Sequence, residues 1–211
     1  MLNIFISFFQ SGGPFMYPIL GVLAIGLAIT IERYISLSSS KTKNRKSLNE
    51  LMPMLQKGEM RGVYEAAAES NATIGKILSQ GLERFKTAKS RDDIESAMEE
   101  TIMEAIPRLE KRTHYLAMFA NIATLLGLLG TIIGLIKAFT AVAQVDASLK
   151  AEILSTSISV AMNTTAFGLI VAIPLLFFYT VLQTKTTEMI DSLEMATMKF
   201  ANLLTQFKKF D

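Results

Sequence analysis

Hydroxyl side chains recur at helical spacing inside two long apolar stretches, Ala120–Phe139 and Ser157–Tyr179. Hydroxyl groups orient and relay water, but they hold no charge at physiological pH. A proton path through a membrane usually includes a titratable Asp, Glu or His, and neither stretch contains one. The stretches therefore predict a polar seam that depends on another chain for any proton carrier. Its candidate pore-lining residues are Thr124, Thr131, Ser157, Asn163, Thr164 and Thr165.

Small residues share the same helical faces. From Ala117 to Ala141 the small and hydroxyl residues alternate at intervals of three and four, which places them on one side of a helix. Such faces most often mediate close packing between membrane helices, and a lone threonine often bonds its own backbone. Helix contact is therefore the alternative interpretation of each residue. The candidate packing residues are Gly127, Gly130, Gly134, Gly168 and Pro174.

Three segments have the composition of membrane spans. Half of the 211 residues are hydrophobic, and the formal net charge of +2 gives no argument for nucleic acid as a partner. No charged residue or histidine occurs in Met1–Ile31, Tyr115–Ile136 or Ile153–Thr184. Each run exceeds the roughly 20 residues that a spanning helix needs. We predict an all-α membrane protein with three transmembrane helices and long cytoplasmic helical extensions.

The placement of basic residues predicts the orientation. Of the 21 Lys and Arg residues, 15 fall between Arg33 and Arg112, and none precedes Arg33. Because positive charge marks the cytoplasmic side, the N-terminus is expected outside and the C-terminus in the cytoplasm. Glu32, Arg33 and Lys137 are expected at the membrane edges, the first two as an ion pair.

These observations predict a division of the chain into seven segments. They are an external interfacial helix (1–13), a first transmembrane helix (14–36), a cytoplasmic helical region (37–112), a second transmembrane helix (113–141), a short external loop (142–152), a third transmembrane helix (153–183) and a cytoplasmic C-terminal helix (184–211). The basic residues of segment 38–46 predict a hinge beside the inner leaflet, where each cation attracts anionic lipid by about 1 kcal/mol.

Capping signals predict the helix boundaries of the cytoplasmic region. Ser47 has the spacing of a capping box, Asn71 or Thr73 could cap the following helix, and Ser90 precedes a run of acidic residues. Pro107 is expected to kink the helix that leads into the second span. The third span and the tail keep helical periodicity and are expected to form one helix over 151–206, roughly 80 Å long.

Residues for enzymatic or metal chemistry are scarce. The chain has no cysteine and one histidine, which removes thiolate sites and most imidazole chemistry. Gly127, Gly130 and Gly134 lie inside an apolar helix, so they do not form a nucleotide-binding loop. We find no nucleophile with a base and no carboxylate dyad in the sequence. We therefore expect neither an enzyme nor a metal or organic cofactor.

Three sequence segments resemble the spans of the MotA/TolQ/ExbB proton-channel family. They are GGPFMYPIL with the following ITIERY, ANIATLLGLLGTIIGLIKAF and NTTAFGLIVAIP. The resemblance covers nearly the whole chain and is strongest to the ExbB branch, with TolQ next. It places that family's pore threonines on Thr131 and Thr165. ExbB-branch members often carry a glutamate five residues before the second of these, where this chain has Val160.

The resemblance implies an assembly. It would be a homopentameric helical bundle in the bacterial inner membrane, around a dimeric ExbD- or TolR-like single-span partner that supplies an intramembrane aspartate. Thr131 and Thr165 would face that carboxylate. Protons would be the coupling ion, and a TonB- or TolA-like protein would carry the work to the outer membrane, powering active import.

Other functions remain open from the sequence. Within the family they are TolQ-like envelope constriction and a gliding or flagellar stator. From another class, a non-conducting membrane scaffold would use the small-residue faces only for assembly. A solute transporter is disfavoured, because the sequence has neither repeat symmetry nor a charged midplane site.

Overall fold

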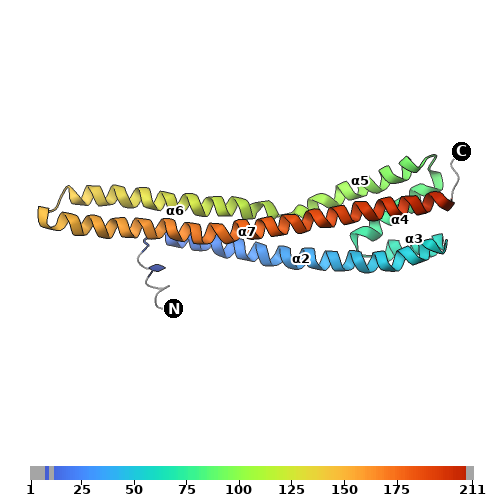
Figure 1. The fold of residues 1–211 in the computed structure, drawn as a ribbon, viewed down its shortest axis with the longest axis horizontal. Coiled ribbons are helices and arrows are strands. Elements are labelled where there is room, and N and C mark those ends of the chain that lie inside the picture. The colour runs from blue at the N-terminus through green and yellow to red at the C-terminus, as the bar shows by residue number, and fades with distance from the viewer. Residues whose placement is uncertain (1–7, 10–11, 208–211) are drawn as a thin grey trace. The chain divides into compact units, whose positions relative to one another are not determined.

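The computed structural model describes residues 8–9 and 12–207, and the regular elements of that part of the chain are all α-helices (Figure 1). The predicted all-α class is therefore confirmed. The helices are α2 (Met16–Gln56), α3 (Met60–Glu69), α4 (Thr73–Thr87), α5 (Arg91–Glu110), α6 (Thr113–Val142) and α7 (Ala147–Phe207).

The chain divides into two compact units. The first unit combines Met1–Glu32 with Arg112–Val181, and the second combines Arg33–Lys111 with Leu182–Asp211. Helices α2 and α7 contribute to both units, whereas α6 belongs to the first and α3, α4 and α5 to the second.

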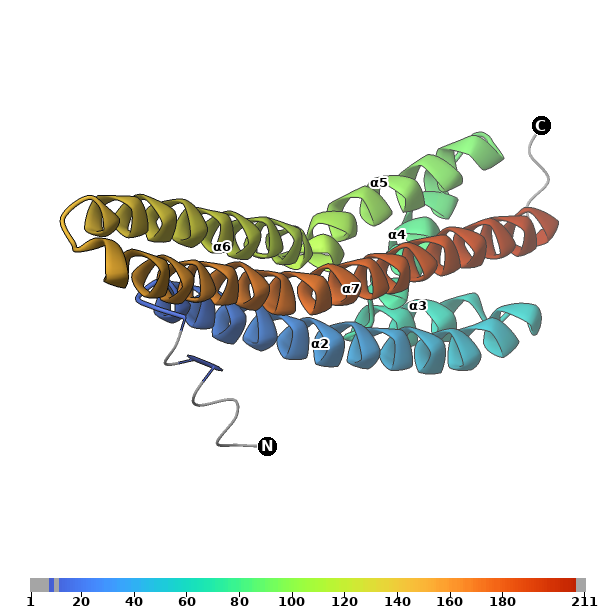
Figure 2. The ribbon, with the colours of Figure 1, turned by 60° about the vertical axis from the view of Figure 1, so that its left-hand side comes forward.

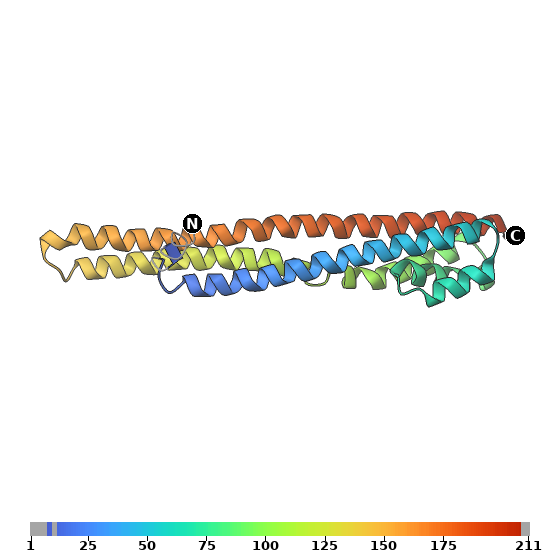
Figure 3. The ribbon, with the colours of Figure 1, turned by 90° about the horizontal axis from the view of Figure 1, so that it is seen from below.

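In the first unit α6, the first part of α7 and the beginning of α2 run side by side (Figure 3). Their contacts use small residues and a few buried large ones, including Met16, Leu116, Phe167 and Leu175. The bulky face of α6 lies outside the bundle, and Leu125 keeps 62% of its surface exposed. Exposed apolar side chains of this kind suit a lipid environment or contact with further helices.

Three segments are long and apolar enough to cross a membrane, by length and composition. They are Met16–Gln56, the segment Arg91–Val142 that includes α6, and Ala147–Phe207. The prediction of three candidate spans is confirmed, and the chain is a membrane protein. The exact limits of each membrane-embedded part remain predictions.

The second unit is a helical bundle with an aliphatic core. Helix α4 packs against both α3 and α5, and Figure 2 shows them gathered with the parts of α2 and α7 that belong to this unit. Leucine and isoleucine side chains such as Leu55, Ile77 and Leu204 are completely buried in it. The C-terminal part of α7, from Leu182, therefore belongs to the same compact unit as the region that precedes the second span.

The expected hinge at 38–46 is wrong, because α2 continues without interruption from Met16 to Gln56. The segment contains neither Gly nor Pro, and its polar side chains are compatible with a helix. The Thr42 hydroxyl, for example, donates to the carbonyl of Ser38 at 3.0 Å. Ser47 consequently lies inside α2 and starts no helix; its hydroxyl instead contacts that of Ser70 at 3.0 Å.

The expected caps of α4 are also wrong. The residue before the helix is Ala72, which offers no capping side chain. Two other residues replace it: the Ser70 hydroxyl accepts from the amide of Ala72 at 3.2 Å, and Asn44 Oδ1 accepts from the amide of Ile74 at 3.2 Å. Because Asn44 lies on α2, this cap depends on tertiary structure, which sequence spacing does not reveal.

The expected cap of α5 at Ser90 is confirmed. Its hydroxyl accepts from the amide of Asp93 at 3.3 Å, and the Asp93 carboxylate accepts from the amide of Ser90 at 3.1 Å, which completes a capping box. Helix α5 runs through Pro107 to Glu110, so the proline lies in its last turn, and the expected kink there stays a prediction. The chain then turns at Arg112, which has a left-handed φ of 64°.

The C-terminal helix α7 is one continuous element, as expected, and it begins at Ala147 inside the segment expected to be a loop. Residues 143–146 connect it to α6. The expected interfacial helix at 1–13 falls mostly outside the described residues.

Replacing Ser90 with alanine should destabilise the start of α5. Loss of an N-cap hydroxyl costs about 1 kcal/mol of helix stability, because the amide of Asp93 loses its acceptor. Hydrogen exchange should therefore accelerate about fivefold at the first-turn amides of α5 and stay unchanged in α3. Equal exchange rates at these amides in the Ser90→Ala variant and the unmodified protein would contradict the capping role of Ser90.

The same box makes α5 sensitive to acid. Hydrogen bonds from the amides of Lys89 and Ser90 hold the pKa of Asp93 below its usual value of 3.8. A carboxylate with a lowered folded pKa adds stability at neutral pH that is lost as the pH falls through that pKa. Titration of the Asp93 carboxyl signal by NMR should thus show a midpoint below 3.8, and the Ser90→Ala variant should move it upward.

Candidate functional site

Thr131 of α6 and Thr165 of α7 face one another inside the first unit. Both residues are half-buried, and their hydroxyls are hydrogen-bonded to each other. The Thr165 hydroxyl also lies 2.9 Å from the carbonyl oxygen of Gly127. The Thr131 hydroxyl lies 3.2 Å from the same carbonyl oxygen and 3.2 Å from that of Ala161. Two hydroxyls predicted from separate stretches are therefore brought together.

The pair has more acceptors than protons to donate. Each hydroxyl carries one proton, whereas its surroundings offer the other hydroxyl and at least one backbone carbonyl. Rotation of a hydroxyl therefore exchanges one hydrogen-bond partner for another without moving the backbone. Such a pair can orient water or an incoming carboxylic acid, but it cannot itself store a charge.

Glycines allow the two helices to approach at this point. A Cβ atom built on Gly168 would lie 2.7 Å from the carbonyl oxygen of Ala123, and one on Gly127 would lie 3.2 Å from Cα of Thr165. At Gly134 it would lie 2.9 Å from Cβ of Ala161. Gly130 is similarly close to the side chain of Thr164. All four predicted packing glycines thus lie where α6 meets α7, whereas Pro174 is exposed.

Thr164 points away from the threonine pair. It is buried, and its hydroxyl lies 2.5 Å from the carbonyl oxygen of Gly12 and 3.0 Å from that of Val160. This contact ties α7 to the segment that precedes α2. The structure therefore distinguishes the adjacent threonines, both of which are candidate pore-lining residues in the sequence.

The remaining polar candidates lie on the same two helices. The Thr124 hydroxyl donates to the carbonyl of Ala120 at 3.1 Å, within its own helix, and the residue is exposed. Ser157 and Asn163 on α7 are half-buried. The seam as a whole stays a prediction, and within it the hydroxyls of Thr131 and Thr165 are in contact.

The charged candidates have partners on different elements. Glu32 pairs with Arg112 at 3.4 Å, whereas Arg33 is buried and donates to the carbonyl of Leu109. Consecutive residues on a helix point in different directions, which lets Glu32 and Arg33 reach these separate partners. The expected Glu32–Arg33 pair stays a prediction. Lys137 on α6 is exposed. Among the described residues, no cluster of acidic, His or Cys side chains could hold a metal ion.

Comparison with known families places this geometry in context. The sequence model of the MotA/TolQ/ExbB proton channel family matches residues 69–195, more than half of the chain. The chain belongs to the MotA/TolQ/ExbB proton channel family. The match includes all of α4, α5 and α6 and most of α7, so both threonines of the pair lie inside it. This is a family of channels and not of enzymes.

Several ExbB proteins are similar over most of the chain. An ExbB homolog of Methanothermobacter thermautotrophicus is 26% identical over 90% of this chain and 67% of its own length. An ExbB-like protein of Synechocystis is 24% identical over 80% of both chains. The ExbB protein of Aquifex aeolicus is 32% identical over 53% of this chain and 72% of its own. All three carry the name biopolymer transport protein, and the ExbB-like assignment is confirmed.

The sequence did not indicate which backbone carbonyl groups accept hydrogen bonds from the threonines of this site. The carbonyls of Gly127 and Ala161 contact Thr131, and the carbonyl of Gly12 contacts Thr164. A carbonyl has no side-chain signature, so only the glycine spacing on α6 could have indicated close backbone approach. The contact from Arg33 to Leu109 likewise joins residues that no sequence motif relates.

Proposed function

We propose that this chain is the channel subunit of an ExbB–ExbD type motor in the bacterial inner membrane. Five copies surround a dimeric single-span partner, with the N-terminus periplasmic and the C-terminus cytoplasmic. Proton flow at the interface with the partner drives movement between the two oligomers. A TonB-like protein transmits that movement to the outer membrane and powers active import.

The observation that carries the proposal is the threonine pair between α6 and α7. It combines two hydroxyls with backbone carbonyls in helices that contain no acid from Tyr115 to Ile136 or from Ile153 to Thr184. Hydroxyls can stabilise a neighbouring carboxylic acid or carboxylate by hydrogen bonding, but they cannot carry the proton charge alone. The partner therefore supplies an intramembrane aspartate, and no other cofactor is needed.

The energy of one proton explains why the motor must cycle. One proton that crosses a potential of 100 mV releases about 2.3 kcal/mol. We infer that mechanical work on an outer-membrane receptor takes more than that amount, so that several protons act in sequence. The relatives' shared name, biopolymer transport protein, favours import over envelope constriction or a gliding or flagellar stator.

Proton uptake by proteoliposomes tests the proposal. The chain is reconstituted with an ExbD-like single-span partner, and uptake of protons is followed under an imposed potassium potential. We expect uptake from the complex and none from this chain alone. Replacing the partner's membrane aspartate with asparagine should abolish uptake. Equal uptake with the asparagine variant would reject the proposed division of roles.

A non-conducting scaffold is the second candidate, because the glycine faces of α6 and α7 are used for contact within the chain. A scaffold would form the same complex with the partner but leave the proteoliposomes proton-tight. Native mass spectrometry of the complex separates failure to assemble from failure to conduct, since five copies with two partners are expected in either case.

A further inference from the structure

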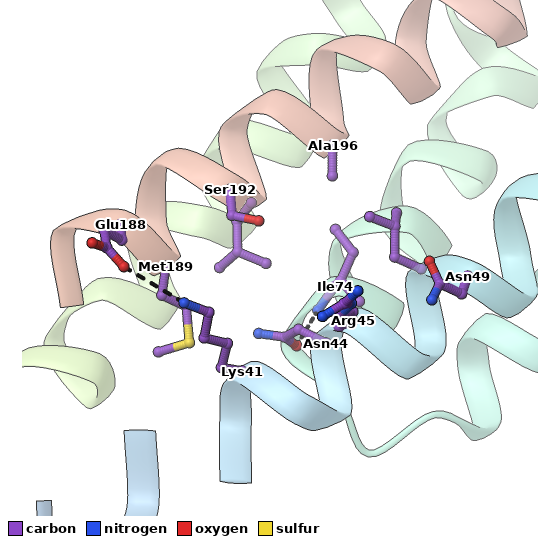
Figure 4. A pocket seen from close by; sticks show the side chains of 11 residues that line it. Lys41, Asn44, Arg45, Asn49, Ile74, Glu188, Met189, Ser192 and Ala196 are labelled. Carbon is purple, nitrogen blue, oxygen red and sulfur yellow. Dashed lines mark hydrogen bonds and ion pairs between the residues drawn. The ribbon is translucent and has the colours of Figure 1, made fainter. Parts of the chain in front are cut away.

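A cavity of about 330 Å³ opens between α2, α4 and α7 in the second unit (Figure 4). Its α4 and α7 walls carry apolar side chains, including Ile74, Met189, Leu193 and Ala196. Cavities of this size can hold a small ligand when a few polar groups converge on them. The polar groups here come mainly from α2.

Asn44 places a buried hydrogen-bond donor, its side-chain Nδ2 group, at the cavity. It lines the cavity and keeps only 9% of its surface exposed. Its Oδ1 accepts from the amide of Ile74, which fixes the orientation of the side-chain amide. The Nδ2 group is buried, has no hydrogen-bond partner among the described residues, and projects among the lining side chains (Figure 4). Buried donors are normally paired, so the cavity is suited to a ligand that brings an acceptor.

The charges around the cavity favour an anionic acceptor. Lys41 and Arg45 line it on α2, and Glu188 lines it on α7. Lys41 Nζ lies 3.5 Å from Glu188 Oε2, but both side chains are more than half exposed, so solvent screens this pair. Arg45 makes no ion pair with any other described residue. The lining thus has one positive charge in excess.

We propose that this cavity binds an amphipathic anion, with a carboxylate or phosphate headgroup on a short aliphatic chain. Asn44 Nδ2 donates to an anionic oxygen, Lys41 and Arg45 compensate the charge, and the chain lies against Met189 and Leu193. A hydrogen bond to a charged oxygen is stronger than one between neutral groups, so Asn44 selects for the anion. This site is independent of the proton path.

Hexanoate is a suitable probe, and the full chain in phosphatidylcholine nanodiscs is a suitable sample. Isothermal titration calorimetry should show saturable binding of hexanoate and at least about tenfold weaker binding of hexanol, which lacks the anion. Binding of both ligands with equal affinity would overturn the proposal, as would no binding of hexanoate.

The Asn44→Asp variant tests the donor directly. It keeps an oxygen to accept from the amide of Ile74 but replaces the Nδ2 donor with negative charge, so hexanoate should bind at least about tenfold more weakly. Asn202→Asp is the matched control, because Asn202 is exposed on α7 and does not line the cavity. Unchanged affinity in Asn44→Asp would reject the site.

Two further measurements complete the test. The Arg45→Gln variant changes an exposed side chain, so it should fold normally. It should lower hexanoate affinity about threefold, and unchanged affinity would count against the charge argument.

Nanodiscs that contain phosphatidylglycerol identify the source of the headgroup. Competition with hexanoate in them would assign the site to an anionic lipid, and unchanged hexanoate affinity would assign it to a soluble anion.

Discussion

Replacing Gly168 with leucine is expected to separate α6 from α7 and to destabilise the first unit strongly. Even a methyl group at this position would lie 2.7 Å from the carbonyl oxygen of Ala123, which belongs to the backbone and cannot rotate away. Overpacking a close contact costs about 1–3 kcal/mol for small additions, and leucine adds far more. The thermal unfolding midpoint in detergent should fall by about 10 °C or more. Such a shift corresponds to a loss of roughly 3 kcal/mol in the free energy of unfolding.

The matched control is Gly21→Leu. Gly21 is exposed on α2, and a Cβ atom there would meet nothing within 4 Å. Substitution of an exposed helical glycine removes backbone freedom and should leave stability unchanged or slightly higher. Similar unfolding midpoints of the Gly168→Leu and Gly21→Leu variants would show that the glycine contact between α6 and α7 contributes little to stability.

Replacing Thr165 with valine should reduce proton uptake by the reconstituted complex about tenfold. Valine has nearly the shape of threonine, so packing is retained while the hydroxyl that contacts Thr131 and the carbonyl of Gly127 is lost. Loss of one hydrogen bond to a charged or reacting group costs about 1.5 kcal/mol or more, which corresponds to about tenfold in rate. The initial rate of proton uptake under a fixed potential is the appropriate measurement.

Thr140→Val is the control for this variant. Thr140 lies on the same helix as Thr131, is exposed, and its hydroxyl donates to the carbonyl of Ile136 at 2.8 Å. Its replacement should leave proton uptake unchanged. Full uptake by Thr165→Val, with normal assembly, would reject the role of Thr165 in the proton path.

Periodicity and local capping chemistry predicted much of the fold. Apolar runs indicated the candidate spans, the period of the tail indicated one long α7, and Ser90 with the following acids indicated the start of α5. These features depend on residues close together in sequence. For the same reason the spacing placed the small and hydroxyl residues on one face of each helix, but it did not show which residues of α6 and α7 meet.

The errors arose where distant residues decide the structure. The basic segment after the first span resembles a hinge, but it is helical because it belongs to a helix that packs within the second unit. The start of α4 lacks a local cap because Asn44 of α2 provides it. Similarly, Thr164 and Thr165 are adjacent in sequence, yet only the contacts with Gly12 and Gly127 separate their roles.

Disulfide cross-linking tests the central claim most directly, because the chain has no cysteine of its own. Thr165→Cys is combined with a partner whose membrane aspartate is replaced by cysteine, and Ile173→Cys, on the exposed face of α7, is the control. We predict a cross-link from position 165 and none from position 173. A cross-link from Ile173→Cys alone would place the partner's acid away from the threonine pair and contradict the proposed proton path.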